Sequence, residues 1–256
     1  MRFFSKAKLG LTTLMWVIVL VIIKLSVVQL GWEILEISPL YTSALSGSVF
    51  ILGFLLAGVF ADYREAERAP AELRAIFENI WEEARFFKQS SPQFDLELVR
   101  QTLLRAIEGI FTGLSYKKNY IGIEPVIATL EELSPTLREM ERLGLPANHI
   151  VRLKGERSNA VRILLRIRHI QRTQFVPSVY FLAESIVAIV IFLLLFLESS
   201  GTATALVLFG FLTYLFLYIG QLIPILEQPF RQGQATQDDV SLFLLHELEE
   251  KLQQTA

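Results

Sequence analysis

The chain has 256 residues and a formal net charge of −2, and 52% of its residues are hydrophobic. The near-neutral charge argues against a general nucleic-acid binder, which is usually basic overall. Because the sequence contains no cysteine, disulfides, thiolate metal sites and cysteine nucleophiles are excluded. The mean hydropathy of +0.45 is high for a soluble globular protein, so the placement of the apolar residues decides the class.

Four apolar blocks follow one another along the chain. They cover residues 10–30, 44–61, 177–197 and 203–226, and the only charges inside them are Lys24 and Glu184. A helix needs about 20 apolar residues to cross about 30 Å of hydrocarbon. The sequence therefore predicts four membrane spans, arranged as an N-terminal hairpin within residues 1–61 and a C-terminal hairpin within residues 177–226.

The basic residues outside these blocks lie on one predicted side of the membrane. Three precede the first block, 18 lie in residues 62–176 and two follow the fourth block, whereas loops 31–43 and 198–202 carry none. This positive-inside pattern predicts a multi-pass protein with both termini cytoplasmic, and we expect it in the plasma (inner) membrane. The alternative for the first block is a cleaved secretory signal. Its length, its Lys24 and the lack of a small-x-small site after it argue against cleavage.

Residues 62–176 predict a cytoplasmic helical region. Amphipathic stripes begin near Ile76, Leu96 and Ile123, and Pro146 opens a helix that runs to about Arg172. Pro70 predicts a kink or a restart of the helix that leaves the second span. Residues 227–256 predict a cytoplasmic tail helix, in which Thr236 and Asp239 have capping-box spacing. The predicted fold class is all-α, with helices that continue from the membrane into one cytoplasmic bundle.

Signatures of catalysis are missing from the sequence. It has no phosphate-binding glycine loop and no hydrolase nucleophile motif, and its three histidines are scattered. We therefore expect no enzymatic activity, no cofactor and no metal. The remaining classes are a channel, a transporter or a scaffold.

The two intramembrane charges are functional candidates by default. Lys24 and Glu184 differ in depth by about 10 Å at 1.5 Å per residue, which is too far for a direct pair. Lys24 can instead extend toward the outer interface. Glu184 can line an inner vestibule or bond to a neighbouring helix.

The second span carries two stripes with a spacing of four residues. Gly53, Ala57 and Ala61 form a small face that allows close helix packing. An adjacent face is formed by Ser46, Phe50 and Phe54. If that face lined a pore, its two rings would form a hydrophobic constriction, or neck. The alternative is that these rings pack against other helices or face lipid.

Residues 152–172 hold seven basic residues against one acidic residue. The four at the end of this stretch are Arg162, Arg166, Arg168 and Arg172. They form either a solvated face that sets the topology or a positive cytoplasmic face that attracts anions or anionic lipid headgroups.

Several short motifs, in this order, resemble bestrophins. Phe50 and the LGF of residues 52–54 resemble their second helix, and PSVY at 177–180 resembles the start of their third span. FLTYLFLYIGQL leads to Glu227, to Pro229-Phe230 and to Asp238-Asp239, which is similar to the bestrophin run after the fourth span. The Arg-Trp-Trp pattern after the second span is missing, because the chain reads Asp62-Tyr63-Arg64 there, and Arg231 replaces a glycine. The chain thus looks like the divergent, poorly characterised bestrophin-like group.

The resemblance implies a homopentamer around a central pore that conducts monovalent anions such as chloride. Phe50 and Phe54 would line the neck, and Ser46 would lie one turn above them. Calcium binding near Asp238 and Asp239 is not predicted, because a helix cap explains these residues equally well. The alternative function is a non-conducting membrane scaffold whose cytoplasmic bundle recruits partners.

Overall fold

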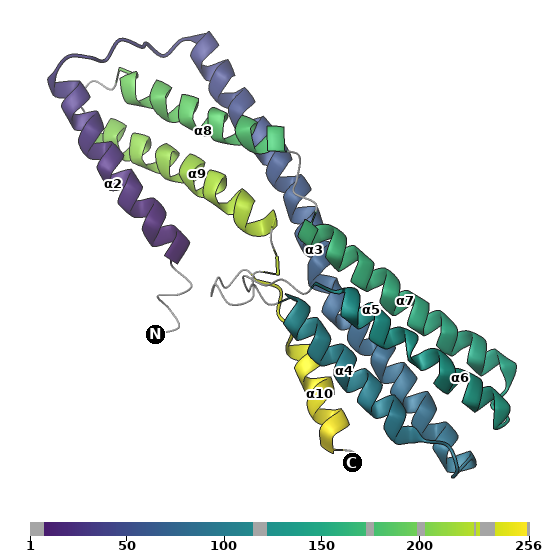
Figure 1. Cartoon of the computed structure of the whole chain (residues 1–256). Coiled ribbons are helices and arrows are strands. Elements are labelled where there is room, and N and C mark those ends of the chain that lie inside the picture. Colours follow the sequence, from purple (N-terminus) through teal and green to yellow (C-terminus); the bar gives the residue numbers. More distant parts are fainter. Residues whose placement is uncertain are drawn as a thin grey trace. The chain divides into compact units, whose positions relative to one another are not determined.

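The computed structural model describes residues 8–114, 122–172, 177–198, 203–227, 229–230 and 239–254. Helices dominate this part of the chain (Figure 1). They are α2 (Lys8–Gln29), α3 (Pro39–Ser90), α4 (Leu96–Leu114), α5 (Glu124–Glu131), α6 (Leu133–Arg142), α7 (Ala147–Arg172), α8 (Pro177–Phe196), α9 (Ala203–Glu227) and α10 (Phe243–Gln254). The predicted all-α fold class is confirmed.

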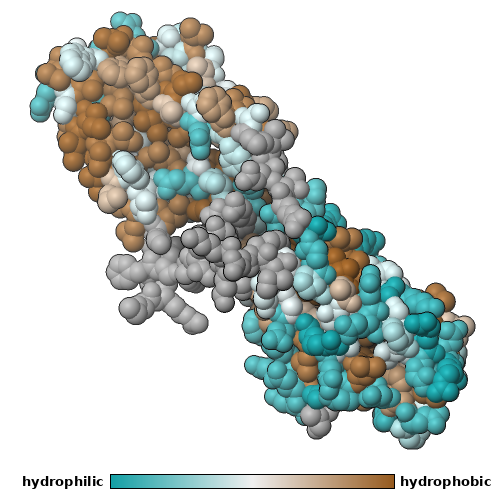
Figure 2. Space-filling model, in the orientation of Figure 1, coloured by the Kyte–Doolittle hydropathy of each residue, from teal (hydrophilic) through white to brown (hydrophobic). Residues whose placement is uncertain are grey.

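The chain divides into two compact units, and the division falls within α3, after Tyr63. The membrane unit contains α2, the start of α3, α8 and α9. The bundle unit contains the rest of α3, α4 to α7 and α10. Figure 2 shows mainly hydrophobic residues over the membrane unit and mainly hydrophilic residues over the bundle unit.

The membrane unit has four helices that are long and apolar enough to cross a bilayer, as the sequence predicts. Its core is formed by residues that recur at helical spacing on α3, α8 and α9. They are Leu52, Val59, Ala183, Val187, Val190, Leu194, Phe209, Phe216, Ile223 and Leu226. Only 17–22% of the most apolar window of each span is buried within the chain. The four helices therefore leave most of their apolar surface to lipid or to other copies.

The bundle unit buries the stripes that the sequence predicts. Phe77 and Trp81 of α3 and Leu103 and Ile107 of α4 are almost fully buried. Gly144 ends the segment after α6 with a φ of +100°, a conformation that glycine adopts without a steric penalty. The amphipathic helices thus share one apolar core.

Helix α3 continues through Pro70 and is 52 residues long. The predicted restart at Pro70 is therefore wrong. Proline in a helix interior loses a backbone hydrogen bond and costs about 3 kcal/mol. Here Ala66, Ala69, Pro70 and Leu73 are all buried, and we infer that their packing outweighs this local cost.

The tail helix begins later than its sequence pattern suggests. Helix α10 starts at Phe243, and the described Asp239 lies in a bend before it. Thr236 and Asp238 lie outside the described residues. The predicted capping box therefore does not begin this helix, whose first turn is closed by the Leu245 N–H donating to the Leu242 carbonyl (3.0 Å).

Candidate pore face and charged residues

The aromatic stripe of α3 points away from the core of its own chain. Phe50 is 75% exposed and Phe54 is 73% exposed, and Ser46 on the same stripe is exposed too. Leu52 and Val59 occupy the opposite side of the helix and are buried against α8 and α9. Helix α3 therefore buries one face within its own chain and leaves the aromatic stripe exposed.

The small-residue stripe also lies outside the core. Gly53, Ala57 and Ala61 are exposed, and a Cβ added at Gly53 would meet no atom within 4 Å. Among the described residues, then, Gly53 gives no close approach to another helix of the same chain. A packing role for this stripe remains a prediction for contacts between copies.

Serine hydroxyls on the first turns of α3 are satisfied locally. Ser43 Oγ donates to the Pro39 carbonyl (2.8 Å) and Ser48 Oγ donates to the Ala44 carbonyl (2.8 Å). This bonding back to residue i−4 lets small hydroxyl side chains lie in an apolar span at little cost. The polar residues near Ser46 are therefore compatible with a membrane helix.

Lys24 lies in a site that sequence reasoning missed. Its side chain is 1% exposed, so the ammonium does not reach water, and it forms an ion pair with Glu33 at 2.7 Å. The same ammonium donates to the carbonyls of Leu195 (3.0 Å) and Leu197 (2.5 Å). The available signal was Glu33, an acidic residue nine positions later in a loop without bases.

Glu184, the other intramembrane charge, is exposed on α8. The neighbouring Phe181 is 73% exposed, whereas Ala183 and Val187 face the core. The carboxylate thus points away from the core of its own chain, and the ion partner of Lys24 is Glu33 rather than Glu184.

Acidic residues balance much of the basic stretch on α7. Arg166 pairs with Glu65, and Arg168 pairs with Glu124 at 2.7 Å. Arg162 is exposed. Arg172 is the last residue of α7, and its side chain lies outside the description. The positive field of α7 is therefore weaker than its sequence suggests.

The histidines of the described residues do not gather into a metal-binding cluster. Over those parts of the chain, no group of three or more His, Cys, Asp or Glu residues could hold a metal ion. His149 Nδ1 lies 2.5 Å from Glu83 Oε1 in the bundle unit. The ring of His246 stacks on Phe111 with a centroid distance of 4.0 Å. Structural contacts account for both histidines.

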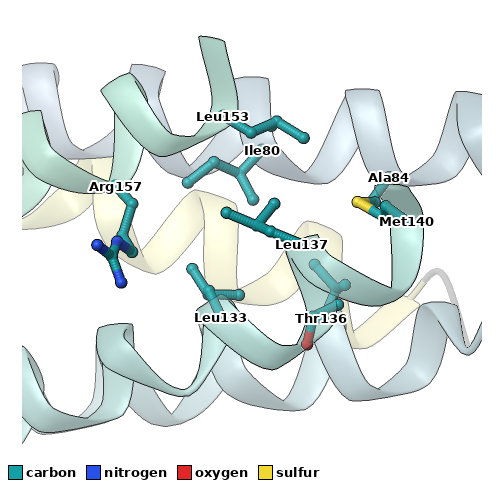
Figure 3. A pocket seen from close by; sticks show the side chains of 9 residues that line it. Ile80, Ala84, Leu133, Thr136, Leu137, Met140, Leu153 and Arg157 are labelled. Atoms are coloured by element: carbon teal, nitrogen blue, oxygen red, sulfur yellow. The ribbon is translucent and has the colours of Figure 1, made fainter. Parts of the chain in front are cut away.

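A small cavity lies between α3, α4, α6 and α7 in the bundle unit. Its volume is about 10 Å³, which is about enough for one water molecule. Figure 3 shows the apolar side chains of Ile80, Leu133 and Leu137 around it, with Arg157 at one side. This space is too small for an organic substrate.

Comparison with known structures identifies the fold. A variant of a bacterial bestrophin homologue from Klebsiella pneumoniae matches with a TM-score of 0.77 and 14% identity, over 95% of this chain and 97% of that chain. A second variant matches with a TM-score of 0.73 and 15% identity, over 98% of each chain. A structure described as a membrane protein matches with a TM-score of 0.72 and 15% identity, over 95% of this chain and 96% of that one. No family model and no curated protein sequence matches the chain.

The chain therefore has the fold of the bacterial bestrophin homologues over nearly its whole length. The fold that the motif resemblance implies is confirmed, at a sequence identity of only 14–15%.

Proposed function

We propose that several copies of this chain assemble into a membrane channel that conducts monovalent anions through a hydrophobic neck lined by α3. The observation that carries the proposal is the outward aromatic stripe: Phe50 and Phe54 are 75% and 73% exposed on a span of a bestrophin-like fold. Two rings one helical turn apart, repeated around an axis, would form a constriction that opens and closes by wetting.

The neck is tested by conductance in planar bilayers. Phe50→Ala and Phe54→Ala should each increase the conductance, because removing a ring widens the constriction and makes it easier to hydrate. Phe181→Ala is the matched control, since Phe181 is an equally exposed phenylalanine (73%) on α8 of the same unit. Conductance that rises equally in all three variants would contradict a specific neck at Phe50 and Phe54.

Anion selectivity is the second part of the proposal. It rests on the resemblance and on the basic stretch of α7, of which Arg166 and Arg168 already have acidic partners. Reversal potentials in a salt gradient should show a preference for chloride over the cation. A preference for the cation would be consistent with a pore but would contradict the proposed role of α7 in anion selectivity.

The alternative function is a non-conducting scaffold whose bundle unit recruits partners. The observation in its favour is that Phe86 and Val151 of this unit are 65% and 69% exposed. A well-folded oligomer that passes no current would favour the scaffold.

A further inference from the structure

The buried ammonium of Lys24 lies at the end of the membrane unit where α2 ends and α3 begins. A lysine ammonium has three N–H donors. Here it has three acceptors: Glu33 Oε1 at 2.7 Å, the Leu195 carbonyl at 3.0 Å and the Leu197 carbonyl at 2.5 Å. The cation is therefore both paired and fully hydrogen-bonded, which is the condition under which a buried charge is tolerated.

The same place carries a short backbone ladder. The N–H groups of Ile34 and Leu35 donate to the Phe196 carbonyl (3.1 and 3.0 Å), and the Glu198 N–H donates to the Leu35 carbonyl (2.7 Å). Leu35 and Leu197 form a parallel β-bridge. The last carbonyls of a helix lack partners within the helix. At the end of α8, Lys24 and the α2–α3 loop supply the hydrogen-bond donors for these carbonyls.

These contacts join three segments, which are the end of α2, the α2–α3 loop and the end of α8. We call the residues that make them the Lys24 latch: Lys24, residues 33–35 and residues 195–198. Helix α3 starts at Pro39, soon after the latch. Its first turn is capped by Ser38, whose hydroxyl oxygen accepts the Tyr41 N–H (3.2 Å). Few residues therefore separate the latch from the turns of α3 that bear Ser46 and Phe50.

We propose that Lys24 is a positioning residue for α3. It fixes the α2–α3 loop on the C-terminus of α8 and so holds the first turns of α3 against the core of the subunit. An apolar side chain at this position would leave the Glu33 carboxylate and two helix-end carbonyls without this donor. The effect on conduction rests on the proposed pore, whereas the latch itself can be measured without it.

Hydrogen exchange of the full chain in detergent tests the latch. In Lys24→Met, which keeps the unbranched stem of the side chain but lacks the ammonium, the amides of residues 34, 35 and 198 should exchange roughly 10- to 100-fold faster, the range that corresponds to losing hydrogen bonds to a charged group. Leu25→Met is the matched control, because Leu25 is the adjacent residue and is 40% exposed. Unchanged exchange in Lys24→Met would overturn the proposal.

A second variant covers the case in which Lys24→Met does not fold. Glu33→Gln keeps an acceptor for the ammonium but removes its counter-charge. The same three amides should exchange faster, by a smaller factor than in Lys24→Met. Exchange at the wild-type rate in Glu33→Gln would contradict the latch.

The positioning role is tested by a reversible disulfide. Because the chain has no cysteine, Leu35→Cys with Leu197→Cys would introduce the only thiols. Neighbouring strands lie about 4.8 Å apart, which falls within the Cα spacing that a disulfide spans. In a Lys24→Met background, oxidation should restore slow exchange and return the single-channel conductance to a narrow, wild-type distribution.

The outcomes separate the two proposals. If Lys24→Met exchanges faster but conducts like wild type, the positioning role is overturned and the pore stands. If the wild-type oligomer passes no current, the proposed function fails together with the positioning role, while the exchange result still reports the latch.

Discussion

Exposure separates phenylalanines that stabilise a subunit from those available to its surroundings. On α3, Phe77 is 0% exposed in the core of the bundle unit, whereas Phe86, nine residues later, is 65% exposed. Phe50 and Phe54 belong to the second kind. The core of the chain therefore does not depend on the two proposed neck residues, which leaves their rings available for a function.

This contrast yields a prediction about stability. Phe77→Ala should destabilise the bundle unit by about 3–5 kcal/mol, because it removes a buried ring and leaves a cavity. Phe86→Ala should change the free energy of unfolding by about 0.5 kcal/mol or less, as surface substitutions usually do. Thermal melts of the full chain in detergent, followed by circular dichroism, measure both. Equal losses would mean that the Phe86 ring is covered.

The residue that sequence reasoning placed least well was Lys24. The sequence shows that Lys24 is a charge inside a span, but it does not show its partners. One partner comes from a loop, and two come from the end of another span, 171 and 173 residues away in the chain. Such contacts depend on how the helices pack, which periodicity does not encode. The α7 arginines illustrate the same limit, since their glutamates lie on α3 and ahead of α7 on α5.

At the scale of elements, α10 is held on the bundle by both apolar and ionic contacts. Leu245, Leu248 and Leu252 are buried, and Lys251 donates to Glu78 at 2.6 Å and to Glu82 at 3.2 Å. The hydrogen bond from Lys251 lowers the pKa of Glu78, and the bond to Glu78 raises the pKa of Lys251. Both shifts mean that docking of α10 favours the charged pair.

The pair predicts how the stability depends on pH. The contribution of Glu78 is present above its unfolded pKa of about 4.5 and is lost as the pH falls through its lower folded value. That of Lys251 is present below its unfolded pKa of about 10.5 and is lost as the pH rises through its higher folded value.

Lys251→Gln is the variant that tests this dependence. Because both partners are partly exposed (39% and 30%), it should cost only about 0.5–1 kcal/mol between pH 5 and 10. The melting difference between wild type and Lys251→Gln should therefore be constant in that window and shrink outside it. A difference that persists at pH 3 would show that packing of the lysine stem, not charge, is responsible.

Element types were predictable from the sequence, whereas several ends were not. The spans and the α7 helix follow directly from long apolar blocks and from Pro146. The passage of α3 through Pro70 does not, because tertiary packing around Ala66 and Leu73 opposes a local preference. The start of α10 at Phe243 was missed because Thr236 and Asp239 have capping-box spacing without beginning that helix.

At the scale of the whole molecule, the membrane unit buries little of its apolar surface within the chain. No more than 22% of any span's most apolar window is buried within the chain. Lipid can cover the apolar remainder, but a pore lined by one helix per subunit requires several copies around an axis.

The mass in detergent tests this requirement. The oligomer should have a protein mass five times that of the 29.2-kDa chain, which is the pentamer implied by the resemblance. Native mass spectrometry measures it, and Gly53→Leu, placed on the exposed small-residue stripe, should lower the share of oligomer if that stripe packs between copies. A monomer or dimer would rule out the neck.

The exposed carboxylate of Glu184 makes one side of the membrane unit more polar than the side formed by α2. It lies about 10 Å inside α8, counted from Pro177 at 1.5 Å per residue, where contact with acyl chains is costly for a charge. By contrast, the exposed side chains of α2 include the large apolar residues Trp16, Ile18 and Ile22. We therefore expect the chain to orient in a bilayer so that α2 contacts the hydrocarbon and the Glu184 side of α8 faces protein or water.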